Sequence, residues 1–217
     1  HLTRLLLVHG RWAYLRVAEI ALLSLYKNIA FVIVLFWYQF FSGFTAQYVY
    51  DYMYLLYLNM LFTFLPLLAL GLQDRDLYAR DLLSVPPIYR LGIRQSSYSM
   101  RRFLLYVLDA LFQSAACFML PMGTYADVAV DSSGHPETQT MLGNVMALSI
   151  IVSVNSYALI NTYSWTIATG VCYLLSLGLT VSVLAIYSAF PSERLYGSME
   201  VFAQARFLFV LPMSVVV

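Results

Sequence analysis

The 217-residue sequence is too apolar and too sparsely charged for an ordinary water-soluble domain. It is 61% hydrophobic and 11% charged, with a mean hydropathy of +0.75, whereas soluble domains carry about 25% charged residues. A net charge of +1, without a basic cluster interleaved with aromatic residues, gives no indication of nucleic-acid binding. We interpret the two cysteines, Cys117 and Cys172, as packing residues because both lie in apolar stretches. The composition predicts an all-α fold, a polytopic transmembrane helical bundle.

Five apolar stretches are long enough to cross a bilayer, which takes about 20 residues. A basic lead-in at 1–19 precedes them, and a long polar stretch at 73–102 separates the second from the third. A sixth apolar run, at 207–217, is too short to cross and is expected to be a truncated span. Because the sequence begins without methionine and ends inside an apolar run, we expect a fragment of a longer chain. The five predicted spans are 20–44, 54–72, 103–122, 141–160 and 167–189.

The distribution of arginine predicts the orientation in the membrane. Short cytoplasmic loops are enriched in Lys and Arg. The lead-in has three arginines and the 73–102 loop has six, whereas the loops at 45–53 and 123–140 have neither residue. The N-terminus and the 73–102 loop are therefore predicted to be cytoplasmic. The loops at 123–140 and 190–206 are predicted to be exoplasmic and to belong to a helical support region at 103–217.

Lys27 is the only lysine of the chain, and it lies in the first predicted span beside Asn28. A charge near the middle of a span costs roughly 2.5–3.5 kcal/mol, so such a residue is a candidate functional residue. At 1.5 Å per residue, Lys27 lies about 10 Å from the cytoplasmic edge. Its long side chain can reach back to the interface, or it can line a polar pathway or pair with a buried acid. The adjacent Asn28 favours the pathway.

The second predicted span has polar residues and a helix breaker. Asn59 and Thr63 are four residues apart and are expected to share a helix face. Pro66 has no N–H, which leaves the Phe62 carbonyl without its helical donor. Freed carbonyls are tolerated where they meet protein or a hydrated cavity. These residues therefore indicate either hydrogen bonding between helices or a polar transport path. By depth, Thr63 and Pro66 lie closer to the level of Lys27 than Asn59 does.

The third predicted span contains Asp109, with Gln113 one turn later. Asp109 lies at about the depth of Lys27. We therefore predict that the two form a buried pair or share a hydrogen-bond network, with Gln113 as a further candidate partner. Asn144 and Asn155, in the fourth span, have no evident partner and are interpreted as packing residues.

The sequence contains no recognisable catalytic or metal-binding motif. It has no phosphate-binding glycine loop, no zinc-ligand spacing and no Ser-His-Asp arrangement. We predict no metal site and no cofactor within this chain.

Several segments resemble the C-terminal membrane region of the phospholipid-translocating P-type ATPases, or lipid flippases. The resemblance is specific up to about residue 123 and covers nearly the whole chain. Glu19 departs from it, because a basic or neutral residue is expected there. The matching segments are 9–17 (HGRWAYLRV), 26–28 (YKN), 36–38 (FWY), 43–47 (GFTAQ), 59–66 (NMLFTFLP), 74–76 (DRD), 87–89 (PIY), 101–103 (RRF), 121–123 (PMG) and 163–166 (YSWT).

The resemblance implies a mechanism. In such proteins, ATP with magnesium phosphorylates a cytoplasmic aspartate, and phospholipid moves from the exoplasmic to the cytoplasmic leaflet. The segment 20–72 would be a transport hairpin, equivalent to family spans five and six. The 73–102 loop would couple the spans to the cytoplasmic ATPase domains. An accessory two-span membrane subunit is an expected partner. The implied transport-path residues are Lys27, Asn28, Asn59, Thr63 and Pro66, and the implied coupling residues are Asp74, Asp76, Arg101 and Arg102.

Without the phosphorylation and nucleotide sites, this chain alone is expected to have no ATPase activity. Two other interpretations stay open. One is a non-catalytic helical support domain that binds an accessory membrane subunit. The other is a free-standing small transporter. The resemblance places the parent protein in a plasma, Golgi or endosomal membrane.

Overall fold

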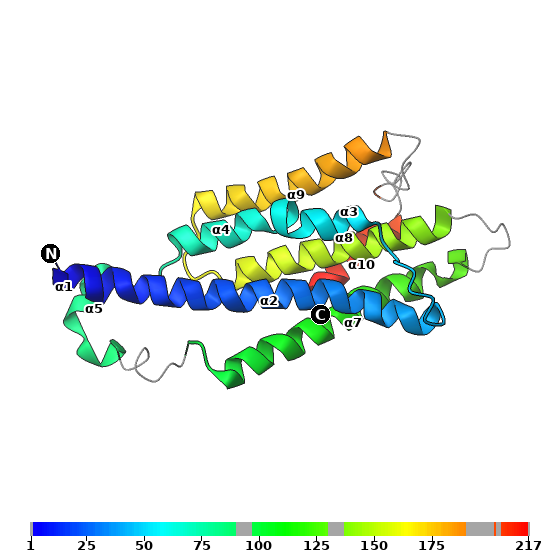
Figure 1. The fold of residues 1–217 in the computed structure, drawn as a ribbon. Coiled ribbons are helices and arrows are strands. Elements are labelled where there is room, and N and C mark those ends of the chain that lie inside the picture. The colour runs from blue at the N-terminus through cyan, green and yellow to red at the C-terminus, as the bar shows by residue number, and fades with distance from the viewer. Residues whose placement is uncertain (1, 90–96, 130–136, 190–201, 203–204, 217) are drawn as a thin grey trace.

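A computed structural model describes residues 2–89, 97–129, 137–189, 202 and 205–216. These residues form helices and no strand. Five of the helices are long and apolar enough to cross a membrane, by length and composition, so the predicted fold class is confirmed. The first helix runs along the whole length of the bundle (Figure 1). The five candidate spans are Leu5–Phe41, Tyr52–Gln73, Met100–Thr124, Thr140–Ile160 and Ile167–Ser188.

The first helix is the longest element. A short α1 (Leu2–Arg4) and a π-helical turn η1 (Leu5–His9) lead without a break into α2 (Gly10–Phe41). The helix ends in a Schellman motif. Gly43 adopts a left-handed φ of 62°, and the Phe44 N–H donates to the carbonyl of Gln39 at 3.0 Å. Glycine fits this position because it has no Cβ to clash there.

The start of this helix differs from the sequence prediction. The span was predicted from residue 20, after a basic lead-in, but α2 is already helical at Gly10. Arg11 and Arg16 lower the hydropathy of this part, yet both have partners in the folded chain. Arg11 binds Asp76, and the Arg16 Nε donates to the Asp74 carbonyl at 2.5 Å. Polar residues with tertiary partners therefore extend the helix beyond its apolar stretch.

The second span is broken into three parts. Asp51 caps α3 (Tyr52–Tyr57) by accepting from the Met53 N–H at 2.9 Å. A π-helical turn, η2 (Leu58–Phe62), follows, and α4 (Phe64–Gln73) completes the span. Thr63 joins η2 to α4 with φ −129° and ψ 0°, outside the helical region. The break therefore lies within one turn of the predicted breaker, Pro66.

The last three long helices and α10 close the bundle. They are α7 (Met100–Ala129), α8 (Glu137–Ile160), α9 (Ile167–Ser188) and α10 (Ala205–Val216). In α8, 72% of the apolar stretch is buried, against 22–39% in the other four candidate spans. The fourth span is therefore the central helix, with α2, α4, α7, α9 and α10 packed against it.

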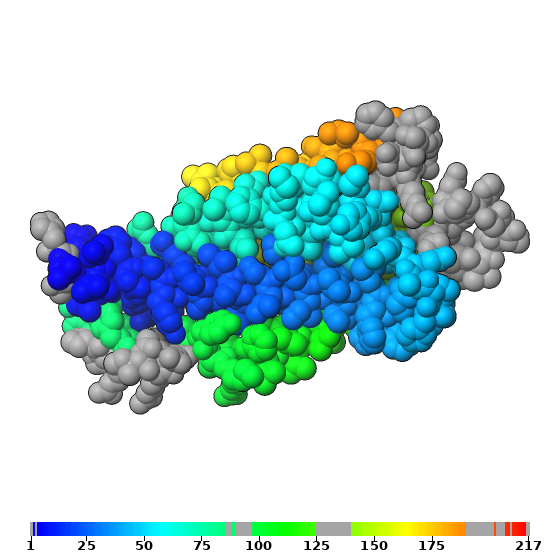
Figure 2. Space-filling view, viewed as in Figure 1, coloured from blue at the N-terminus to red at the C-terminus, as the bar shows by residue number. Residues whose placement is uncertain are grey.

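The other helices flank this centre. Figure 2 shows α2 on one face of the molecule, between α7 on one side and the broken second span on the other. On the far side of that span, α9 packs against α4 and η2. The second span therefore lies between the first helix and the fifth span.

The ends of spans two to five lie close to their predicted positions. The predicted cytoplasmic loop is not wholly irregular, since it contains α5 (Ala79–Ser84) and the 3-10 turn η3 (Pro86–Tyr89). The predicted exoplasmic loop at 123–140 is shorter in the structure, because α7 continues to Ala129 and α8 begins at Glu137, and residues 130–136 lie outside the described part. Of the predicted loop at 190–206, the structure describes only residues 202, 205 and 206.

Candidate functional site

Lys27 is buried where the second span is broken. Its side chain is only 6% exposed, and its ammonium donates to the Thr63 hydroxyl at 3.0 Å. The same hydroxyl donates to the Leu58 carbonyl at 2.6 Å, which leaves its lone pairs available to accept from Lys27. The pairing agrees with the depth estimate, which placed Thr63 rather than Asn59 near the level of Lys27. The sequence analysis named both residues as site candidates, but it predicted Asp109 rather than Thr63 as the partner of Lys27.

Lys27 has no acidic partner in the part of the chain that the structure describes. The ion pairs there are Arg11 with Asp76 and Arg102 with Glu19, both at 2.6 Å. An ammonium removed from water without a counter-charge is costly, because a hydroxyl replaces only part of its hydration. An anionic group bound beside Lys27 would supply the missing counter-charge.

The expectation that Asn59 and Thr63 share a helix face is wrong. Thr63 is buried, whereas Asn59 is exposed. The expectation assumed an uninterrupted α-helix. In the structure, the Thr63 N–H bonds to the carbonyl of Leu58, five residues back, at 3.1 Å. This wider turn changes the angle between the two side chains.

The Phe62 carbonyl, predicted to lose its helical donor to Pro66, has two other donors. The Asn155 amide of α8 donates to it at 2.9 Å, and the Ser176 hydroxyl of α9 also donates to it. Asn155 was interpreted as a packing residue, and Ser176 was not singled out. The freed carbonyl predicts that some donor is needed, but the sequence does not indicate which of the many hydroxyl and amide side chains faces it.

Asp109 and Lys27 do not form the predicted buried pair. Asp109 is exposed, on the outer face of α7, and accepts from the Tyr157 hydroxyl at 2.9 Å. Equal depth on two helices does not place side chains on facing sides, and here the two point to different neighbours. Gln113 is buried, but it donates to the Ser214 carbonyl of α10 at 2.6 Å. Neither residue is a hydrogen-bond partner of Lys27.

Glu19, noted as a departure from the family pattern, joins α2 to α7. It is buried, pairs with Arg102 at 2.6 Å and accepts a hydrogen bond from the Tyr106 hydroxyl. Arg102 also donates to the Ser97 carbonyl at 3.0 Å. The preceding Arg101 is exposed and has no side-chain partner among the described residues. Of the two arginines predicted to couple the domains, Arg102 therefore joins α2 to α7, whereas Arg101 is exposed.

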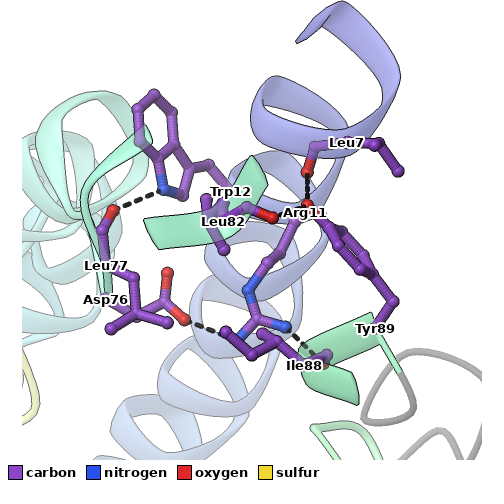
Figure 3. Close-up of polar contacts among 8 residues, drawn as sticks. All are labelled: Leu7, Arg11, Trp12, Asp76, Leu77, Leu82, Ile88 and Tyr89. Carbon is purple, nitrogen blue, oxygen red and sulfur yellow. Dashed lines mark hydrogen bonds and ion pairs between the residues drawn. The ribbon is translucent and has the colours of Figure 1, made fainter. Parts of the chain in front are cut away.

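The two acids predicted to couple the domains, Asp74 and Asp76, attach the 73–89 segment to the bundle. Asp76 pairs with Arg11, whose guanidinium also donates to the Ile88 carbonyl at 3.0 Å (Figure 3). The buried Asp74 carboxylate accepts from the Ser164 N–H at 2.8 Å. Both acids thus bind within the chain. They fix the loop against the first helix and the turn between α8 and α9.

Aromatic residues complete this attachment. The Trp12 indole donates to the Leu77 carbonyl at 3.2 Å, and the Tyr89 hydroxyl donates to the carbonyls of Leu7 and Leu82 at 3.1 and 2.9 Å. Figure 3 shows the side chains of the loop gathered around the first helix. Leu82 packs with Val8 and Trp12 in a small core of their own. The loop therefore has both polar and apolar anchors.

Two further predicted site residues are at the surface or in the packing. Asn28 is exposed beside the buried Lys27, and Pro66 is buried. At the other end of the bundle, the buried Tyr50 phenol donates to the Phe31 carbonyl at 2.6 Å. Burial raises the pKa of Tyr50, which keeps it protonated as a donor. Within the described residues, no group of three His, Cys, Asp or Glu side chains is arranged to hold a metal ion.

The fold and the site define an integral, multi-pass α-helical membrane domain with a buried lysine at a helix break. Residues 1–217 match the family described as "Phospholipid-translocating P-type ATPase C-terminal". The chain belongs to this family, as the sequence resemblance predicted.

Relatives in fungi and mammals support this assignment. The chain is 36% identical over 196 residues to Phospholipid-transporting ATPase DNF1 of Saccharomyces cerevisiae, which covers 89% of this chain and 12% of the relative. It is 37% identical over 191 residues to Phospholipid-transporting ATPase VB of Homo sapiens, covering 87% and 12%. It is 40% identical over 155 residues to Phospholipid-transporting ATPase VD of Mus musculus, covering 70% and 11%. The chain thus spans about an eighth of these relatives.

Proposed function

We propose that this chain forms the C-terminal membrane helices of an ATP-driven phospholipid translocase, which moves lipid from the exoplasmic to the cytoplasmic leaflet. Lys27 and Thr63 would contact the transported headgroup. Asn28, Asn59 and Pro66 would line or shape its path. The observation that carries the proposal is the buried ammonium of Lys27, hydrogen-bonded to a hydroxyl at a helix break and without an acidic partner in the described residues.

A phospholipid supplies what this site lacks. Its phosphate carries a negative charge, and a charge-assisted hydrogen bond from an ammonium to phosphate is about twice as strong as a neutral one. The apolar tails would stay in the bilayer, while the headgroup exchanges water for polar groups of the protein. The absence of an acidic partner for Lys27 therefore favours a transient contact with an anionic headgroup over a permanent structural ion pair.

The remaining parts of the proposal concern the rest of the parent protein. ATP and magnesium would act in cytoplasmic domains outside this chain. The N-terminus and the 73–102 loop would face these domains. Arg101 is the exposed coupling residue, whereas Asp74, Asp76 and Arg102 would keep the loop and α7 in place for docking. By the same proposal, this chain alone hydrolyses no ATP.

The test is Lys27→Met in the full-length parent, with lipid-stimulated ATP hydrolysis and uptake of fluorescent phospholipid as readouts. We expect lipid stimulation to fall about 10- to 100-fold, the equivalent of one hydrogen bond to a charged group. Thermal stability should stay equal or rise, because replacing an unpaired buried charge by a similar apolar side chain removes a desolvation cost. Ser182→Ala, an exposed hydroxyl on α9, is the control. Normal activity at normal abundance would exclude Lys27 from the mechanism.

A support role beside transport is the second candidate, with an accessory two-span membrane subunit as the partner. The fifth span favours it, since only 22% of its apolar stretch is buried and Ile186, near its exoplasmic end, is exposed. A photo-crosslinker at Ile186 in the full-length parent should capture a small membrane protein, while one at the exposed Leu105 of α7 should capture lipid. Lipid alone at both positions would remove the subunit from this face.

A further inference from the structure

The Phe62 carbonyl is held by a closed ring of three hydrogen bonds from two other spans. The Asn155 amide nitrogen donates to the Phe62 carbonyl at 2.9 Å and to the Ser176 hydroxyl oxygen at 3.1 Å. The Ser176 hydroxyl in turn donates to the same carbonyl. All three residues are buried. Each of the two Asn155 N–H groups and the Ser176 O–H has one acceptor, so the ring has only one consistent arrangement of protons.

Pro66 explains why such a ring exists. In an uninterrupted helix, the Phe62 carbonyl would accept from the N–H of residue 66, which proline lacks. In the apolar interior of a bundle, water does not take over this role freely. Asn155 and Ser176 therefore replace the missing backbone donor from outside the helix.

The unused amide oxygen of Asn155 indicates that the residue acts as a hydrogen-bond donor, through its nitrogen. This oxygen is buried and has no hydrogen-bond partner. A buried amide with an unused oxygen is unfavourable as packing alone, since an apolar side chain of the same size has no polar atom to bury. The two N–H groups, in contrast, are both used. The residue is thus suited to donate to Phe62.

We propose that Asn155 and Ser176 are positioning residues for the Lys27 site, acting through the backbone at Phe62. The next residue, Thr63, has non-helical backbone angles and accepts the hydrogen bond of Lys27. Because regular helix geometry does not fix Thr63, the direction of its hydroxyl depends on what holds the carbonyl before it. The fourth and fifth spans, otherwise helical support, thereby set the geometry of the transport path. This inference rests on the proposed function of Lys27.

Three substitutions in the full-length parent test the inference. Asn155→Asp keeps the shape of the side chain and removes both N–H donors, and Ser176→Ala removes the hydroxyl. Asn144→Asp is the matched control: Asn144 is equally buried in α8, but its oxygen accepts from the Tyr54 hydroxyl at 3.0 Å, which a carboxylate oxygen can also do. The readouts are the lipid concentration for half-maximal ATP hydrolysis, the maximal rate and the melting temperature.

We expect Asn155→Asp and Ser176→Ala to raise the half-maximal lipid concentration about tenfold, as for loss of a well-placed charge-assisted contact. Asn144→Asp should leave it unchanged. Adding Asn155→Asp to Lys27→Met should cause no further loss of lipid response, because the two residues act in one chain of contacts and their effects are not additive. Because Ser176→Ala introduces no charge, it keeps the test open if Asn155→Asp fails to fold.

Pro66→Ala separates positioning from stability. It restores a backbone N–H that can pair with the Phe62 carbonyl and straightens the span. Combined with Ser176→Ala, it should restore the melting temperature but not the lipid response.

The inference is overturned if Asn155→Asp and Ser176→Ala lower the melting temperature while the half-maximal lipid concentration stays at the parent value. It is also overturned if their effects add fully to that of Lys27→Met. The proposed function fails separately, if Lys27→Met alone leaves lipid stimulation intact.

Discussion

At the scale of single residues, Gly143 determines how closely α8 approaches the 42–51 connection. A Cβ at this position would overlap the Val49 carbonyl group and lie 3.1 Å from the Tyr50 Cα. These are backbone atoms, so they have little freedom to move aside. Small residues allow this kind of close approach between membrane helices.

Gly143→Ala should therefore destabilise the protein. We expect the free energy of unfolding to fall by about 1–3 kcal/mol, the usual cost of overpacking. Gly178→Ala is the control, because a Cβ there meets no atom within 4 Å, and it should be neutral or stabilising by about 0.5–1 kcal/mol. The measurement is the melting temperature of the purified parent in detergent. Equal melting temperatures for the two variants would contradict the close approach.

The sequence predicted the lysine within the first span and the helix break in the second span, but not the residues that contact them. Lys27 and Pro66 are identifiable from the sequence, because a charge inside a span requires a polar partner and a proline leaves a carbonyl without its helical donor. Which residue supplies that partner or donor depends on the rotation of the helices about their axes. The π-turn at 58–62 changes this rotation for Asn59, and Asp109 faces outward although it lies at the right depth.

At the scale of elements, the 73–89 segment is attached to the first helix through Arg11 and Asp76. Both side chains are largely removed from water, at 8% and 15% exposed. Removing one partner of such a pair leaves the other buried and uncompensated, which costs about 3–5 kcal/mol when burial is complete.

Asp76→Ala should therefore release this segment. Trypsin should cleave faster at the exposed Arg75 and Arg80 within it, because a loosened loop opens more often. Asp81→Ala removes an exposed acid from the same segment and serves as the control. The rate is measured by mass spectrometry of timed digests of the parent, and equal rates for both variants would show that the pair does not hold the loop.

A second attachment, between α2 and α7, distinguishes two neighbouring arginines. Arg102→Ala leaves the buried Glu19 with Tyr106 as its remaining partner, and we expect a loss of about 2–3 kcal/mol. Arg101→Ala, at the exposed neighbour, should change stability by less than about 0.5 kcal/mol. Melting temperatures of the two variants compare them directly. A larger loss for Arg101→Ala would show that the arginines have exchanged roles.

At the scale of the whole molecule, the number and ends of the spans follow from the sequence because lipid exposure demands long apolar runs. The start of the first helix does not. Arg11, Arg16 and Glu19 indicate a boundary in the sequence, yet each of the three has a partner in the folded chain. Hydropathy therefore underestimates helices whose polar residues are satisfied by tertiary contacts.

The orientation of the bundle is testable with single cysteines in the parent. Gln47→Cys lies at an exposed position of the 42–51 connection and Arg80→Cys in the loop rich in arginine. By the distribution of Lys and Arg, a membrane-impermeant maleimide should label Gln47→Cys in intact cells and Arg80→Cys only after permeabilisation. The unsubstituted parent gives the background labelling. The reverse pattern would invert the proposed topology.

The first and second spans differ in mechanical character. From Gly10 to Phe41 the first is one helix of 32 residues, about 48 Å long and therefore longer than the roughly 30 Å of hydrocarbon it crosses. Such a continuous helix rotates and tilts as one body, so a movement at one end reaches the other. The second span has a joint at Thr63, in contact with the first helix at Lys27. A movement of the first helix at Arg11, where the 73–89 segment is attached, would therefore change the angle between α3 and α4, the two halves of the second span.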